Sequence, residues 1–127
     1  MKKFEGICAA LLTPYDESGK VNCAMLKKQV RWLIGQGIDG FYVCGSTGEA
    51  FLLSPQERMA ILDAVCEENN GEKLVIAHIG QIATEHALEL GRHAKGQWRA
   101  PGRTPFPPSA RFTTNFPARK SSNTIWI

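Results

Sequence analysis

The segment from Gly45 to Gly48, with the sequence Gly-Ser-Thr-Gly, is the part of this chain best suited to chemistry. It holds two hydroxyl side chains, Ser46 and Thr47, and directly follows the apolar run 41–44. Glycines let a backbone turn tightly, so that its N–H groups and both hydroxyls can converge on one small anion such as a carboxylate. We therefore predict a carboxylate site lined by both glycines; the alternative is that the segment is only a tight connection.

The elements that must position this loop form a repeating pattern of apolar runs and amphipathic stretches. Strand starts recur about every 33 to 34 residues with a helix pattern between them, which is typical of right-handed βαβ units on a parallel sheet. Each helix pattern begins at a residue that can cap a helix. The strands are predicted at 7–12, 41–44 and 74–80, and the caps are Asn22, Ser54 with Glu57 as a capping box, and Thr84.

Two fold classes share this pattern, a (β/α)8 barrel and a doubly wound sheet. The glycine fingerprint that a doubly wound sheet uses for phosphate groups is absent after the first apolar run, and no phosphate-binding loop of the Gly-x-x-x-x-Gly-Lys type occurs. A barrel needs about 250 residues. We therefore predict that residues 1–95 are the first three βα units of a (β/α)8 barrel, followed by an irregular tail at 96–127.

Composition excludes several other classes of protein. The chain has 127 residues and a hydrophobic share of 43%, with no apolar run long enough to span a membrane and no signal-peptide pattern, so we expect a cytoplasmic protein without a membrane partner. The four cysteines are widely spaced, which predicts reduced, mostly buried thiols rather than a metal or disulfide framework. His86 and His93 lack a third ligand, so no metal site is predicted there.

The tail from residue 96 to residue 127 differs from the rest of the chain. It holds five basic residues, five prolines and no acidic residue, and it does not resemble a barrel strand. A nucleic-acid-binding arm would explain the charge. A shifted reading frame explains more, because residues 104–127 permit the translation D-A-I-S-S-V-x-P-F-Y-Y-K-F-S-x-E-E-I-K-Q-Y-Y-L-D. We favour this hypothesis, which needs no nucleic-acid partner and predicts a poorly ordered tail.

Three segments, 9–15, 37–51 and 76–80, together resemble the family of pyruvate-dependent class I aldolases that includes dihydrodipicolinate synthase. The motif Gly-Ser-Thr-Gly-Glu-Ala-Phe with Ala-His-Ile-Gly is similar to the sialic acid branch of this family. The resemblance covers residues 5–95. It implies a homo-oligomeric barrel, a tetramer, that cleaves N-acetylneuraminate to N-acetylmannosamine and pyruvate through a lysine Schiff base, without metal or organic cofactor.

The resemblance also assigns roles to individual residues. Ser46 and Thr47 match the residues that hold the pyruvate carboxylate, Thr47 also matches a proton relay between tyrosines, and Ala10 matches a small residue on the floor of the site. In the family the Schiff-base lysine ends strand six and the catalytic tyrosine lies on strand five, and no lysine here lies in a matching motif. We therefore expect this chain alone to be inactive.

Some alternatives stay open. The intact protein can be a sister aldolase that acts on another 2-keto acid, and the chain itself can be a non-catalytic binding module. His78 lies in an apolar strand, which favours a structural or site-lining role over general-base catalysis. Tyr42 and Phe51 flank the loop, and we predict packing roles for both.

Overall fold

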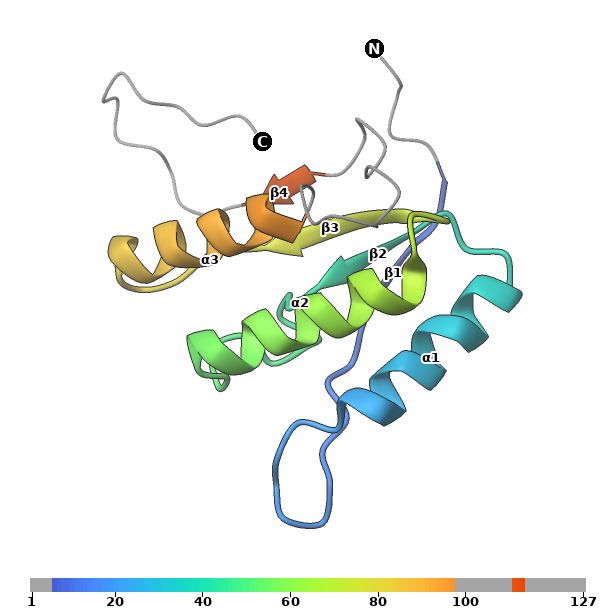
Figure 1. Cartoon of the computed structure of the whole chain (residues 1–127), viewed down its shortest axis with the longest axis horizontal. Helices are drawn as coiled ribbons and strands as arrows, with labels where there is room; N and C mark the ends of the chain where they lie inside the picture. Colours follow the sequence, from blue (N-terminus) through green and yellow to red (C-terminus); the bar gives the residue numbers. More distant parts are fainter. Residues whose placement is uncertain (1–5, 98–110, 114–127) are drawn as a thin grey trace.

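The computed structural model describes residues 6–97 and 111–113 of the chain. Four parallel strands form one sheet in the order β1-β2-β3-β4, and three helices connect them. α1 packs against α2 and α2 against α3 on the same side of the sheet (Figure 1). The elements are β1 (Cys8–Ala10), α1 (Cys23–Gly35), β2 (Gly40–Val43), α2 (Pro55–Asn69), β3 (Leu74–His78), α3 (Thr84–Gln97) and β4 (Arg111–Thr113).

This strand order confirms the predicted fold class. In a doubly wound sheet the strand order reverses and helices cover both faces, whereas in a barrel the strands follow one another and all the helices lie outside. Here each new strand is added on the same side of the previous one. The described residues therefore form part of a (β/α)8 barrel.

Local hydrogen bonds explain where the helices begin. The side chain of Asn22 accepts from the Met25 N–H at 2.9 Å, as predicted for α1. Ser54 and Glu57 form the predicted capping box of α2, with the Glu57 carboxylate 2.8 Å from the Ser54 nitrogen. The prediction for α3 was wrong by one residue: Thr84 is the first helical residue, and the carbonyl that accepts from the Ala87 N–H belongs to Ala83.

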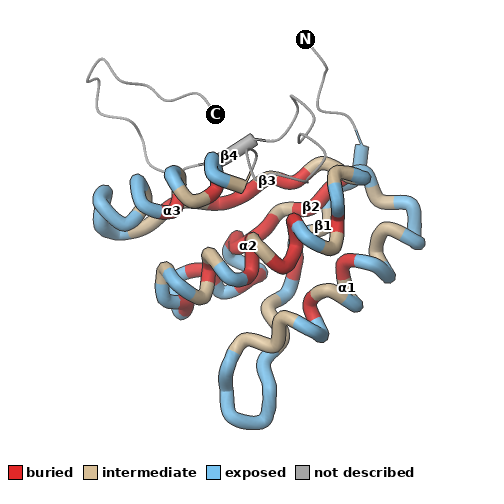
Figure 2. Tube along the Cα trace, in the orientation of Figure 1, coloured by how far each residue is buried: buried red, intermediate tan, exposed pale blue. Residues whose placement is uncertain are grey.

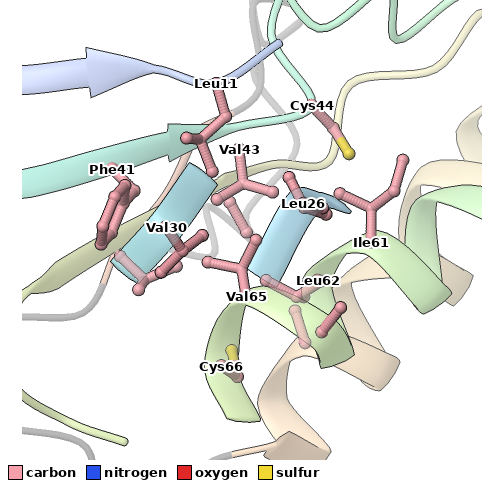
Figure 3. Packing of buried hydrophobic residues seen from close by; sticks show 14 of the residues in the cluster. Leu11, Leu26, Val30, Phe41, Val43, Cys44, Ile61, Leu62, Val65 and Cys66 are labelled. Atoms are coloured by element: carbon pink, nitrogen blue, oxygen red, sulfur yellow. The ribbon is translucent and has the colours of Figure 1, made fainter. Parts of the chain in front are cut away.

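The hydrophobic core lies between the sheet and the inner faces of α1 and α2. Side chains from the sheet, from α1 and from α2 interdigitate there (Figure 3). Burial follows β2, β3 and α2, while the turn at residues 16–20 is exposed (Figure 2). No helix among the described residues combines the length and the apolar character needed to cross a membrane. The core residues that Figure 3 labels are Leu11, Leu26, Val30, Phe41, Val43, Cys44, Ile61, Leu62, Val65 and Cys66.

The first strand is shorter and less buried than the sequence predicts. The apolar run 7–12 indicated a strand buried on both faces, but β1 spans only Cys8–Ala10, and both of these end residues are exposed. Ile7 and Leu12 are 74% and 58% exposed. The reason is that β1 is an edge strand, with a hydrogen-bonded neighbour on one side only among the described residues.

The four cysteines differ in how far they are buried. Cys44 and Cys66 are buried, as predicted. Cys8 is exposed on the edge strand and Cys23 is half-buried at the start of α1, so the prediction of mostly buried thiols was wrong for these two. All four are free thiols.

The tail contains one described element that was not predicted. Arg111–Thr113 forms β4, which pairs in parallel with Ile76–His78 of β3. An open strand edge presents unpaired N–H and C=O groups that any extended segment can bond, whatever its side chains. α3 also continues to Gln97, two residues beyond the predicted boundary at 95. Residues 98–110 and 114–127, and with them most of the prediction of poor order, lie outside the described residues.

Candidate carboxylate-binding site

The Gly45–Gly48 loop lies at the carboxyl end of β2 and is held by its own short hydrogen bonds. The Gly48 N–H donates to the Gly45 carbonyl at 3.1 Å, and the Glu49 N–H donates to the Ser46 carbonyl at 3.0 Å. Left-handed backbone conformations flank the loop, with φ of 55° at Cys44 and 57° at Glu49. Such conformations are uncommon for residues other than glycine and occur often at functional sites.

The loop buries its glycines and exposes its hydroxyl residues. A Cβ on Gly45 would lie 2.4 Å from Cε1 of Tyr42, and a Cβ on Gly48 would lie 3.0 Å from the Leu11 carbonyl oxygen. Both positions are therefore closely packed against the strand ends. Ser46 and Thr47 are exposed, and neither hydroxyl has a hydrogen-bond partner within residues 6–97. Their donors are available to a ligand.

The end of β1 lies beside this loop. Ala10 pairs with Tyr42 in the parallel register, and the Leu11 N–H donates to the Tyr42 carbonyl at 3.0 Å. The Thr13 hydroxyl donates to the Gly48 carbonyl at 2.7 Å, which ties the chain after β1 to the loop. Ala10 is exposed at this edge. Sequence analysis proposed Ala10 but missed Thr13, for which only the Thr-Pro end of the first apolar run was a signal.

His78 ends β3 and supports the loop from the other side. Its ring is 6% exposed, and Nδ1 lies 2.8 Å from the carbonyl oxygen of Cys44. Burial lowers the pKa of His78, and the nearby Arg58 lowers it further, while the bond to the Cys44 carbonyl acts in the opposite direction. The ring is therefore neutral at pH 7, with Nδ1–H donating to Cys44. This supports the predicted structural role.

Two aromatic rings enclose His78. The ring centroids of Tyr42 and Phe51 each lie 6.1 Å from that of His78, the Phe51 contact being edge-on. The contact of half-buried Tyr42 agrees with its predicted packing role, whereas Phe51 is 60% exposed and packs only along one edge. Neighbouring Cys44 is unsuited to nucleophilic attack, because burial raises the pKa of its thiol to about 11, against an opposing effect of Arg58.

Arg58 of α2 is, after Thr13, a second residue of this site that the sequence did not predict. It is 2% exposed, and it donates to the main-chain carbonyls of Gly80, at 2.7 Å, and of His78. A signal for it did exist: Arg58 precedes Ile61 and Leu62 by three and four residues, so helical spacing places it on the same buried face.

Other candidate groups lie away from this site. Lys27 pairs with Glu67 at 2.8 Å, and Lys73 precedes β3 at the amino edge of the sheet. His93 Nε2 lies 2.7 Å from the Asp63 carboxylate between α2 and α3. Among residues 6–97 no group of three or more His, Cys, Asp or Glu side chains is arranged to hold a metal ion.

Comparison with known proteins connects this arrangement to a family. N-acetylneuraminate lyase of Salmonella paratyphi B is 47% identical over 94 residues, which are 74% of this chain and 32% of the lyase. The structure of N-acetylneuraminate lyase from Aliivibrio salmonicida superimposes with a TM-score of 0.74 at 41% identity, covering 76% of this chain and 32% of that one. Dihydrodipicolinate synthase from Aquifex aeolicus gives 0.70 at 34% identity, covering 74% and 32%.

The chain thus spans about a third of the length of the relatives that it matches. The family profile described as the Dihydrodipicolinate synthetase family matches residues 3–98, which include the described helices and the first three strands. Together with the sequential parallel strands and the Gly-Ser-Thr-Gly loop at their carboxyl edge, this match shows that the chain belongs to the dihydrodipicolinate synthetase family.

Proposed function

We propose that residues 6–97 form the first three βα units of a class I aldolase that cleaves N-acetylneuraminate to N-acetylmannosamine and pyruvate. Within them, the Gly45–Gly48 loop binds the carboxylate of the pyruvate moiety. The observation that carries the proposal is the pair of exposed hydroxyls of Ser46 and Thr47, which have no hydrogen-bond partner within residues 6–97 and lie between two closely packed glycines. Ala10 lines the floor of the same site from the neighbouring strand end.

Charge-assisted hydrogen bonds explain why this loop would bind a carboxylate. A carboxylate accepts strong bonds from hydroxyl and backbone N–H donors, each worth about 1.5 to 3 kcal/mol when one partner is charged. A loop that is already held by internal bonds and by Thr13 loses little conformational entropy when it binds. The proton-relay role of Thr47 rests on family resemblance alone, because the two tyrosines of the chain are Tyr15 and Tyr42 and the catalytic tyrosine of the family lies on strand five.

The choice of N-acetylneuraminate over other 2-keto acids is supported mainly by the loop, which carries Ser46 where the synthase branch more often has threonine. Identity reaches 47% to the Salmonella lyase and 41% to the Aliivibrio lyase, but the Proteus mirabilis lyase and the Aquifex synthase are both 34% identical to the chain. A sister aldolase remains the second candidate. To separate these two functions, the protein is expressed in the alternative reading frame, and its activity on N-acetylneuraminate is compared with its activity on other 2-keto acids.

We further propose that the chain alone does not turn over substrate. In residues 6–97, Lys27, Lys28 and Lys95 lie on helices and Lys73 precedes β3, so none ends a strand at the carboxyl edge. Lys20 lies in the exposed turn that precedes α1. A Schiff-base lysine needs a pocket that lowers its pKa. Release of pyruvate from N-acetylneuraminate by the purified chain, or borohydride trapping of pyruvate on any of its lysines, would contradict this proposal.

The binding proposal is tested by titrating the full chain with pyruvate and following the backbone amide signals of residues 45–50 by NMR. We expect saturable shifts confined to this loop and its neighbours. Ser46→Ala and Thr47→Val should each weaken pyruvate binding about tenfold. Ser18→Ala is the matched control, because Ser18 is an exposed serine of the turn before α1 that bonds only within that turn. Equal weakening in the control would show that the loop is not the site.

A further inference from the structure

Arg58 is a buried cation whose bonds go to main-chain carbonyls. Its side chain is 2% exposed, although arginine is rarely buried without an acidic partner. The ion pairs of residues 6–97 involve Lys27, Arg31 and His93, and none involves Arg58. Its Nε has no hydrogen-bond partner among the described residues. A group this costly to bury calls for an explanation beyond packing.

The bonds of Arg58 all converge on the carboxyl edge of the sheet. Nη1 donates to the Gly80 carbonyl at 2.7 Å, and Nη2 donates to the His78 carbonyl. These carbonyls lie at the end of β3 and just beyond it. One planar guanidinium therefore fixes the exit of the chain from β3, which lysine cannot do with the same geometry.

From β3 the connection continues to the carboxylate loop. His78 Nδ1–H donates to the Cys44 carbonyl at 2.8 Å, and Cys44 is the left-handed residue that directly precedes Gly45. The His78 ring packs so closely over Gly80 that a Cβ there would lie 2.7 Å from Nε2. Arg58 therefore reaches Cys44, and through it the loop, in two ways: through His78, and by a direct interaction with the Cys44 thiol.

We propose that Arg58 is a positioning residue for the carboxylate-binding loop: acting through His78 and through its own contact with Cys44, it holds Cys44 and thereby the direction in which Ser46 and Thr47 face a ligand. Its charge is not neutralised by a carboxylate among residues 6–97, so it also makes this edge more favourable for an anion. The identity of the anion rests on the proposed function, whereas the effect of Arg58 on the loop does not.

The test uses the full chain and compares hydrogen exchange at two places. The reporters are the hydrogen-bonded amides of Gly48, Glu49 and Ala50, and the reference is the helical amides of α1. In Arg58→Met, leaving the carbonyls of His78 and Gly80 unpaired should speed exchange in the loop about tenfold relative to α1. Pyruvate affinity should fall by a similar factor.

The matched control is Asn69→Ala, a buried polar residue of the same helix. Asn69 bonds the main chain of Lys73 at the amino edge, far along α2 from the loop, at 2.9 and 3.0 Å. Its loss should destabilise the whole fold and leave the ratio of loop to α1 exchange unchanged. If Arg58→Met and Asn69→Ala change this ratio alike, Arg58 is only a stabilising residue and the proposal is wrong.

Two further variants keep the test decisive if Arg58→Met does not fold. Arg58→Lys keeps the charge and a donor, so it should restore part of the loop protection. His78→Phe removes the bond to the Cys44 carbonyl, and adding Arg58→Lys to it should affect the loop less than Arg58→Lys does in the wild type, because the two side chains share the contact with Cys44. Additive effects would overturn the proposal.

A wild-type chain that binds no pyruvate would contradict the proposed function, while the exchange ratio would still decide the role of Arg58.

Discussion

The two edges of the sheet differ in how they use polar groups. At the amino edge, Asn69 exchanges two hydrogen bonds with the main chain of Lys73, and the Asp39 carboxylate accepts from the Ile7 N–H at 2.7 Å. At the carboxyl edge, Ser46 and Thr47 carry exposed hydroxyls with no partner among residues 6–97. Polar groups at the first edge satisfy one another, and those at the second leave donors for a ligand.

The backbone shows the same contrast. The carboxyl edge holds left-handed conformations at Cys44 and Glu49, whereas the left-handed residues next to the amino edge are Asn70 and three glycines, residue types that adopt this conformation readily. Thr13, His78 and Arg58 stabilise these uncommon conformations at the carboxyl edge. Buried polar side chains thus serve stability at one edge and loop geometry at the other.

The largest expected effect on stability comes from the amino edge. Asn69→Ala leaves the half-buried N–H and carbonyl of Lys73 without their side-chain partner, so the free energy of unfolding should fall by about 3 kcal/mol. Urea unfolding measured by circular dichroism checks this. Pyruvate affinity of the remaining folded chain should not change, and a change in it would show that the two edges are coupled.

A glycine of the loop should combine a smaller loss of stability with a loss of binding. In Gly45→Ala the new Cβ would lie 2.4 Å from the Tyr42 ring, which must move away. We expect the free energy of unfolding to fall by about 2 kcal/mol and pyruvate binding to disappear. Gly35→Ala is the control, since nothing lies within 4 Å of a Cβ at that position. Retained pyruvate affinity in Gly45→Ala would separate loop packing from binding.

The capping box at the start of α2 makes the free energy of unfolding depend on pH. The Ser54 N–H, and after it the Ser54 hydroxyl, lower the pKa of Glu57 below its ordinary value of 4.5. Because the folded pKa is the lower one, this stabilisation is present above pH 4.5 and is lost as the pH falls through the folded value. Unfolding midpoints of wild type and Glu57→Gln should therefore converge at low pH; a constant difference between them would contradict this.

The smallest effect on stability is expected at the ligand-facing residues themselves. Ser46 is exposed and makes no side-chain hydrogen bond within residues 6–97, so Ser46→Ala should change the free energy of unfolding by less than about 0.5 kcal/mol. Thermal unfolding checks this on the same samples used for the pyruvate titration. A large loss of stability would mean that Ser46 supports the loop rather than the ligand.

Most of the fold could be predicted from the sequence because its signals are local. The capping residues Asn22 and Ser54 mark helix starts through bonds that span three residues, and the apolar stripe of Ile61, Leu62 and Val65 marks the buried face of α2. The exposure of β1 could not be predicted in this way. It depends on which strands are present beside it, which a run of apolar residues does not specify.

The candidate site likewise has one part that local sequence signals predict and another that depends on tertiary contacts. The loop is predictable from the sequence alone, because Gly-Ser-Thr-Gly after an apolar strand combines tight turning with hydroxyl donors in consecutive positions. What holds that loop depends on tertiary packing, since Arg58 lies on α2, His78 ends β3 and Cys44 follows β2. Their contacts arise from helix packing and strand register, and no local pattern encodes a hydrogen bond between residues 34 positions apart.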